Sequence, residues 1–160
     1  MWTITYIVAI IAINIGFSYV PLVPLPTGDM FPPLSFAVGI VFVLRDFAQR
    51  EVGHWVLLAM GAAAVLSYLL ADPFVALASV LAFAASELVD WAMYSWTKRP
   101  LHERILWSSA VSTPVDSLVF LGVIGLATAP AVAAMVASKM VAAIVVWWWW
   151  RRTCSTSRAQ

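Results

Sequence analysis

The sequence predicts an all-α integral membrane protein built as a bundle of six transmembrane helices. Of its 160 residues, 63% are hydrophobic and only 11% are charged, whereas a soluble domain is usually about a quarter charged. The apolar residues gather into six stretches close to the roughly 20 residues that a helix needs to cross a bilayer. The basic residues fall almost entirely in three short segments between or after these stretches.

The six apolar stretches leave no room for a soluble domain. Pro21 ends the first stretch, and Pro32 suits the first turn of the second. Asp72, which precedes Pro73, is expected to cap the fourth helix, and Thr128 the sixth. The expected spans are 2–23, 30–47, 54–70, 74–96, 105–127 and 130–150, followed by a polar cytoplasmic tail, 151–160.

The distribution of lysine and arginine sets the expected orientation. With six spans, all the basic residues outside the apolar stretches fall on one side of the membrane, and the other side has none. Because basic loops remain in the cytoplasm, both termini are expected there. These basic residues are Arg45, Arg50, Lys98, Arg99, Arg104, Arg151, Arg152 and Arg158.

Four ionisable residues lie within the apolar spans, where an isolated charge costs roughly 2.5–3.5 kcal/mol. Counting residues along the helices places Asp116 and Lys139 near the centres of spans five and six, and Glu87 near the centre of span four. Asp90 lies one turn from Glu87, and Asn14 lies near the middle of span one. We therefore expect these side chains to face a shared polar pocket halfway through the membrane.

The residues of this layer suggest a flat ligand that is rich in N–H donors. Glu87 and Asp90 share one face of span four with Trp91. A carboxylate accepts two N–H bonds side by side, as the edge of a guanine-type base offers. Sites of this kind also need flat apolar walls, so Trp91, Phe36 or Phe120 is expected to stack on the ring.

Two features leave alternative interpretations open. Lys139 either donates to a carbonyl group of the ligand or neutralises Asp116 in a structural ion pair. Arg45 and Asp46, at the cytoplasmic end of span two, form either an ordinary charged cluster at the membrane edge or an inner gate.

Sequence motifs of several other function classes are absent. The chain has no G-x-x-x-x-G-K-[ST] phosphate loop and no H-E-x-x-H motif. Cys154 is its single cysteine, so an intrachain disulfide is impossible. A net charge of +1 gives no reason to expect nucleic-acid binding. We therefore expect a protein that is not an enzyme and that uses no metal or cofactor.

Four stretches of the chain resemble one known family, and they occur in that family's order. They are PPLSFAVGIVFVLRDFAQREVG, ASVLAFAASELVDWAMYSW, STPVDSLVF and the lysine of ASKMVAAIVV. The most specific match is Glu87 followed three positions later by Asp90, and Asp116 and Lys139 come next. The family is the queuosine precursor transporters, also called the vitamin-uptake-transporter (VUT) family. An asparagine that some members place shortly before the aspartate of span five is missing here.

The resemblance implies a six-helix protein of the bacterial inner membrane that imports 7-cyano-7-deazaguanine, or a related deazapurine, for tRNA modification. It also implies a fold akin to the substrate-binding subunits of energy-coupling-factor transporters, with a substrate site formed by Glu87, Asp90, Asp116 and Lys139. Whether energy-coupling subunits or further copies of the chain take part is left open. The alternatives are a vitamin-binding subunit of an energy-coupling-factor transporter and a small integral-membrane enzyme.

Overall fold

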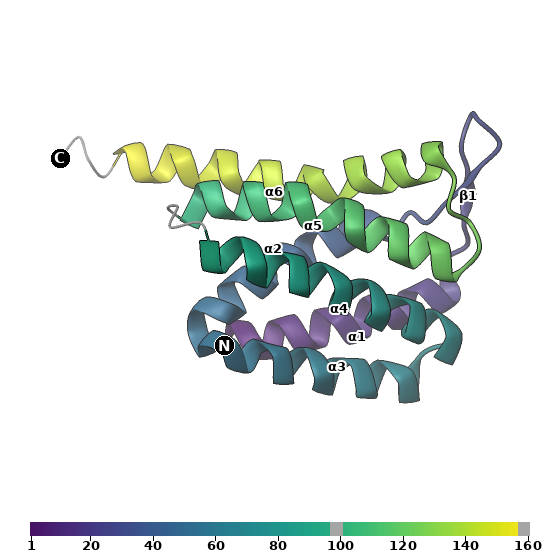
Figure 1. The fold of residues 1–160 in the computed structure, drawn as a ribbon, viewed down its shortest axis with the longest axis horizontal. Helices are drawn as coiled ribbons and strands as arrows, with labels where there is room; N and C mark the ends of the chain where they lie inside the picture. The colour runs from purple at the N-terminus through teal and green to yellow at the C-terminus, as the bar shows by residue number, and fades with distance from the viewer. Residues whose placement is uncertain (97–100, 157–160) are drawn as a thin grey trace.

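In the computed structural model, which describes residues 1–96 and 101–156, six α-helices run roughly side by side (Figure 1). A short two-stranded antiparallel hairpin joins the first helix to the second. The helices are α1 (Trp2–Tyr19), α2 (Ser35–Val52), α3 (Val56–Leu70), α4 (Pro73–Trp96), α5 (Leu101–Val123) and α6 (Ala129–Thr156), with a 3-10 turn, η1 (Gly53–Trp55), between α2 and α3.

The two ends of the bundle differ. The start of α1 and the end of α6 lie at one end, which we call the terminal end (Figure 1). The hairpin of β1 (Val23–Pro24) and β2 (Met30–Phe31) lies at the opposite end, which we call the hairpin end. An even number of helices that alternate in direction produces this arrangement.

The hairpin was not predicted, because Met30 was expected to begin the second helix. Instead, Val23 pairs with Phe31 and Pro24 with Met30. The helix starts only at Ser35, so Pro32 does not lie in its first turn, contrary to expectation. A residue that precedes a proline avoids helical dihedral angles, which favours extended backbone at Phe31 and Pro32. Asp29 in the hairpin turn accepts a hydrogen bond from Thr27 at 2.7 Å, and this bond holds the pKa of Asp29 below its usual value.

The predicted N-caps of α4 and α6 are both present. One carboxylate oxygen of Asp72 accepts the backbone N–H groups of Phe74 and Val75 at 3.0 Å each. The hydroxyl of Thr128 accepts the N–H of Ala131 at 3.3 Å. These caps satisfy N–H groups that have no partner within the helix, so α4 begins at Pro73 as expected and α6 at Ala129.

The end of α5 comes earlier than predicted, at Val123 rather than near residue 127. Gly125 adopts a φ of 77°, a conformation that glycine reaches without steric cost. Its N–H donates to the carbonyl of Gly122, and the N–H of Leu126 donates to the carbonyl of Leu121 at 2.8 Å. This pair of bonds is the Schellman motif, which terminates helices.

Helices α2 and α6 extend beyond the apolar stretches that predicted them. Helix α2 continues through Arg50 to Val52 and stops where Gly53 takes a φ of 62°. Helix α6 continues to Thr156, so the predicted polar tail is helical over residues 151–156. Arginine and lysine favour helices, so a helix can continue past the point where its apolar stretch ends.

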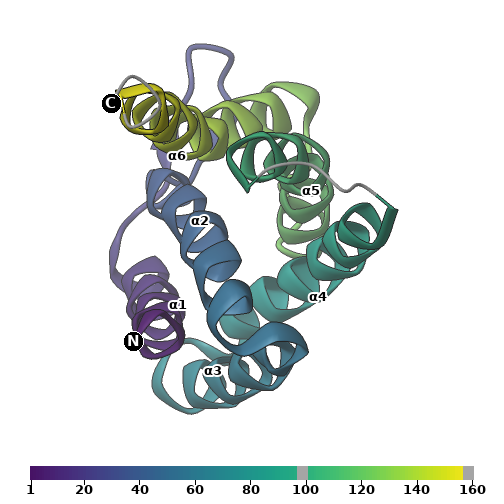
Figure 2. The ribbon, with the colours of Figure 1, turned by 90° about the vertical axis from the view of Figure 1, so that its left-hand side faces the viewer.

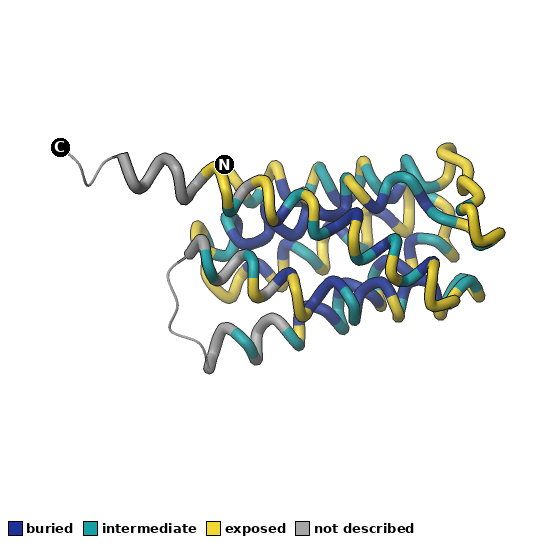
Figure 3. Tube along the Cα trace, turned by 90° about the horizontal axis from the view of Figure 1, so that it is seen from above, coloured by how far each residue is buried: buried dark blue, intermediate teal, exposed yellow. Residues whose placement is uncertain are grey.

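Among the described residues, the buried apolar side chains form two clusters. Helix α2 lies between α1 and α6, and α5 contacts both α4 and α6 (Figure 2). The buried stretches of the helices face the interior of the bundle (Figure 3). The small residues Ala78, Ala82 and Ser86 on α4 are buried, so this face packs within the bundle. Small faces of this kind let membrane helices approach closely.

The outer surface of the bundle is strongly apolar. On α3, for example, Leu58 is 63% exposed and Leu69 is 71% exposed, and apolar surface on this scale requires a partner or lipid. Among the described residues, three stretches have the length and composition to cross a membrane, and shorter apolar stretches, Pro73–Val89 and Ser109–Val123, lie in α4 and α5. The three long stretches are Trp2–Tyr19, Ser35–Leu70 and Ala129–Trp149.

Candidate functional site

In the part of the chain that the structure describes, two buried ion pairs link different helices across the interior of the bundle. Lys139 of α6 pairs with Asp116 of α5, and Arg45 of α2 pairs with Glu87 of α4. All four side chains are at most 7% exposed. Charges removed this far from solvent are stable only when they are paired or hydrogen-bonded, so these two pairs are the first candidates for a functional site.

The Lys139 ammonium group has two partners on α5. It donates to a carboxylate oxygen of Asp116 and, at 3.1 Å, to the hydroxyl of Ser117. The ion pair with Asp116, one of the two interpretations open for Lys139, is therefore present in the structure, and donation to a ligand carbonyl stays a prediction. The nearby hydroxyl of Thr113 is hydrogen-bonded within α5, because it donates to the backbone carbonyl of Ser109 at 2.7 Å.

A glycine on α2 brings the backbone of that helix close to Lys139. A Cβ atom placed on Gly39 would lie 2.4 Å from the carbonyl oxygen of Lys139 and 2.9 Å from its Cα. Only a residue without a side chain allows this approach. Sequence reasoning missed Gly39, although a lone glycine inside a helical pattern often indicates a packing constraint.

Arg45 is surrounded by acceptors inside the bundle. Its Nε atom lies 2.9 Å from Glu87, and an Nη atom lies 3.6 Å from Asp46. The same Nη donates to the side-chain carbonyl of Gln49 at 3.4 Å. Arg45 was expected in a charged cluster at the membrane edge or in an inner gate. The structure turns its side chain into the bundle, where it is 4% exposed, and α2 continues for two more turns beyond it.

The two ion pairs lie at different levels of the bundle. A small enclosed cavity of about 10 Å³ next to Asp116 is also lined by Ser79 and Phe83 of α4. A second cavity of about 10 Å³ adjoins Arg45 and Glu87, and Glu87 follows Phe83 by one helical turn. The two cavities adjoin successive parts of α4, so the pair of Arg45 and Glu87 lies nearer the terminal end than the pair of Lys139 and Asp116. Each cavity has room for about one water molecule.

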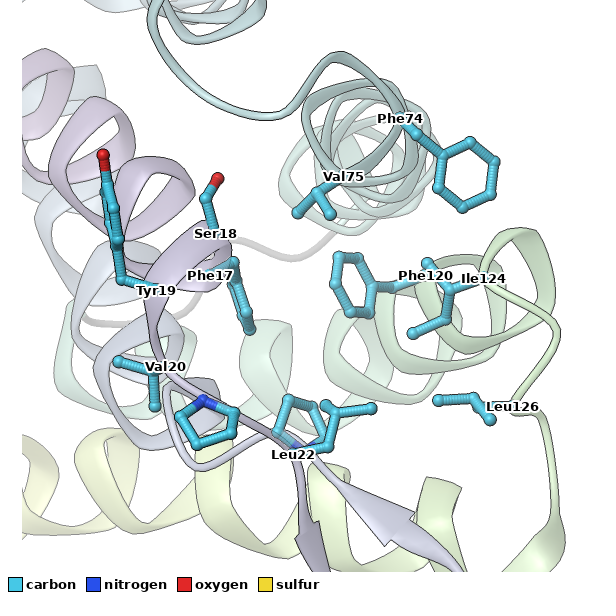
Figure 4. Close-up of a pocket in the computed structure, with 12 residues that line it drawn as sticks. Phe17, Ser18, Tyr19, Val20, Leu22, Phe74, Val75, Phe120, Ile124 and Leu126 are labelled. Atoms are coloured by element: carbon cyan, nitrogen blue, oxygen red, sulfur yellow. The ribbon is translucent and has the colours of Figure 1, made fainter.

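A much larger cavity, of about 520 Å³, opens at the hairpin end (Figure 4). It is enclosed by the end of α1, the start of α4 and the end of α5. Its volume falls in the range of small-molecule sites, about 300–1,000 Å³. Phe17 and Phe120 line both this cavity and the small one next to Asp116, and their ring centroids are 5.3 Å apart.

Other predicted site residues lie apart from these groups. Asn14 is buried and donates to the hydroxyl of Ser67 at 3.1 Å, which links α1 to α3. Phe36 is 52% exposed and packs edge-on against Phe31. It was expected to stack in the central pocket, but its position on α2 faces outward.

The side chains of Asp90 and Trp91 lie outside the part of the chain that the structure describes. Residues 97–100 also lie outside it, and they include Lys98 and Arg99, two of the basic residues expected in the cytoplasm. Within the described residues, no group of three or more histidine, cysteine, aspartate or glutamate residues could hold a metal ion. The described site is therefore an arrangement of paired charges, serines and aromatic rings.

Comparison with known proteins identifies one family. Residues 29–156 match the profile of a family described as "Putative vitamin uptake transporter". No curated protein and no solved structure matches the chain. The matched region includes α2 to α6, and so it contains all four residues of the two buried ion pairs.

Proposed function

We propose that this chain, which belongs to the vitamin uptake transporter family, imports 7-cyano-7-deazaguanine or a related deazapurine for tRNA modification. The family indicates a multi-pass membrane protein that takes up a small molecule. The narrower substrate follows from the resemblance of the motifs around Glu87, Asp90, Asp116 and Lys139 to queuosine precursor transporters and from the chemistry of these side chains. The solute would cross the bacterial inner membrane unchanged.

The buried pair of Lys139 and Asp116 is the observation that supports this substrate most directly. A deazaguanine ring presents a ring N–H and an exocyclic amine next to a carbonyl group. Asp116 would accept the two N–H groups side by side, and Lys139 would donate to the carbonyl. The ligand would thus replace the internal contact between the two side chains, so neither charge would lose its partners on binding.

The second ion pair suits a gate at the terminal end. Arg45 and Glu87 join α2 to α4, and Asp46 and Gln49 hold the guanidinium from its own helix. Glu87 would accept further N–H groups of the substrate once it leaves Arg45, and Asp90 would tune its charge or relay protons. We propose alternating access across six membrane-spanning helices, with both termini in the cytoplasm.

A second candidate function is favoured by the description of the family itself, which names vitamins. In this alternative, the chain is a vitamin-binding subunit that requires separate energy-coupling subunits. Binding of the purified protein to a panel of deazapurines and vitamins separates the two candidates. Uptake by the chain alone, in a host without energy-coupling partners, would exclude the requirement for such subunits.

The direct test is uptake in bacteria that cannot make the precursor, with queuosine in tRNA as the readout. The informative variant combines Asp116→Asn with Lys139→Met, because it removes both charges and leaves no unpaired ion. We expect this variant to fold and to lose uptake by roughly tenfold or more, since each hydrogen bond to a charged group is worth about 1.5–3 kcal/mol.

Glu87→Gln provides a second arm of this test, and Asp29→Asn in the hairpin is a matched control that should transport normally. If the double variant and Glu87→Gln both import the precursor as well as the wild type, these residues do not bind the substrate.

A further inference from the structure

One pair of aromatic rings lines both the hairpin-end cavity and the small cavity next to Asp116. Phe17 comes from the last turn of α1, and Phe120 from the last turn of α5. The two rings face each other at the inner side of the 520 Å³ cavity (Figure 4), with centroids 5.3 Å apart and planes tilted by 36°. The small cavity behind them includes Asp116.

We propose that the hairpin-end cavity is a receiving site for a flat, uncharged ring and that Phe17 and Phe120 form the gate between this site and the Lys139–Asp116 pair. This inference rests on the proposed function and adds a second site to it. The ligand would bind first in the cavity and would pass to Asp116 when the two rings separate.

The lining of the cavity determines the class of ligand. None of its lining residues is charged. Phe17 of α1 and Phe120 of α5 supply aromatic surface to the cavity, whereas the ring of Tyr19 points away from it and is 82% exposed (Figure 4). A charged ligand would lose its hydration there without gaining a partner. A neutral heteroaromatic ring would stack on the rings, in the offset or tilted geometry that aromatic pairs prefer.

The positions of the two rings make movement feasible. The hydroxyl of Ser18, next to Phe17, accepts the N–H of Asp72, so the end of α1 is tied to the start of α4. The Schellman turn at Gly125 follows Phe120 by five residues. Because these contacts hold the backbone at both helix ends, the gate would open by rotation of the two side chains, which leaves the buried ion pairs in place.

Two positions on α4 allow a matched test, because they lie one turn apart on the same face. Val75 lines the hairpin-end cavity, and Ser79 lines the small cavity next to Asp116, on the other side of the rings. In a Cys154→Ser background, Val75→Cys and Ser79→Cys are labelled with a polar thiol reagent in purified protein in lipid nanodiscs. We expect rapid labelling of Val75→Cys and slow labelling of Ser79→Cys.

Removal of both rings, by Phe17→Ala with Phe120→Ala, should raise the labelling rate of Ser79→Cys by roughly tenfold or more. It should not change the rate for Val75→Cys. Phe74→Ala, which removes a ring from the wall instead of the gate, should change neither rate. The gate does not exist if Ser79→Cys reacts as fast as Val75→Cys while both rings are present, or if its rate is unchanged without them.

A failure of folding is detected by the same reporters, because misfolded protein would alter the labelling of Val75→Cys. In that case, Phe17→Leu with Phe120→Leu replaces the alanine pair, with the same criteria. The receiving site is tested by adding 7-cyano-7-deazaguanine, which should slow the labelling of Val75→Cys. If the compound is taken up by cells but does not protect this position, the cavity is not the receiving site.

The labelling of Ser79→Cys requires no substrate, so it tests the gate independently of the proposed substrate. Ring-dependent labelling without uptake of the deazapurine would support the gate and refute the substrate. Uptake combined with ring-independent labelling would support the substrate and refute the gate.

Discussion

Lys139 is the most deeply buried charge among the described side chains that form ion pairs, and its partner on α5 balances it completely. Replacing only Lys139, by Lys139→Met, leaves the Asp116 carboxylate buried without a counter-ion. We expect this change to lower the free energy of unfolding by about 3–5 kcal/mol. Adding Asp116→Asn should restore most of that loss, as measured by denaturant unfolding in detergent micelles.

The same pair of variants separates a structural role from a binding role. A purely structural pair would give a double variant that is both stable and active in uptake. A substrate-binding pair gives a double variant that is stable but inactive, which is the expected result. Equal destabilisation by the single and double variants would show that the pairing between these side chains contributes nothing measurable to stability.

At this scale, the sequence located the buried charged residues and offered the pairing of Lys139 with Asp116, but it did not predict the partner of Glu87. Glu87, Asp116 and Lys139 were identified because charges are rare in apolar stretches, and all three are buried. Their depth follows from counting residues, but the direction in which each faces depends on how the helices rotate against one another. The pairing of Glu87 with Arg45 was therefore missed.

Helices α2 and α6 are in contact through the backbone at Gly39, where a side chain has no room. The nearest atoms are the backbone atoms of Lys139, which cannot move away as a flexible side chain would. We expect Gly39→Ala to push α6 outward and to lower the free energy of unfolding by about 1–3 kcal/mol. Because the displaced residue is Lys139, uptake should fall as well.

Gly61→Ala on α3 is the matched control, because no atom lies within 4 Å of the position that its Cβ would occupy. This change should leave uptake intact and should be neutral or slightly stabilising, since alanine favours a helix more than glycine does. Normal stability and uptake of Gly39→Ala would mean that α2 and α6 tolerate separation at this crossing.

The start and end of each helix were predicted well where the determinants are local. Asp72 and Thr128 cap their helices through hydrogen bonds to the next few residues, and such signals are visible in the chain itself. The helix ends that were predicted from hydropathy alone were less accurate, since α2 and α6 both continue beyond their predicted ends. The hairpin was missed because its two strands are only two residues each and pair across a proline-rich turn.

Across the whole molecule, the proposed functional elements form a series from one end of the bundle to the other. The large cavity lies at the hairpin end, and the rings of Phe17 and Phe120 separate it from Asp116 and Lys139. The pair of Arg45 and Glu87 follows one turn further toward the terminal end. A solute that crosses the protein would meet an aromatic gate first and an ionic gate last.

The direction of this series in the membrane depends on the topology, which a single native cysteine can report. If six helices cross and basic loops remain inside, Cys154 faces the cytoplasm and the hairpin faces outward. A membrane-impermeant maleimide should label Cys154 in inverted vesicles but not in intact cells. Pro26→Cys in a Cys154→Ser background should show the opposite pattern, because Pro26 is exposed in the hairpin. Labelling of both positions from the same side would require an even number of crossings between them. It would therefore show that the five helices α2 to α6 do not all span the bilayer.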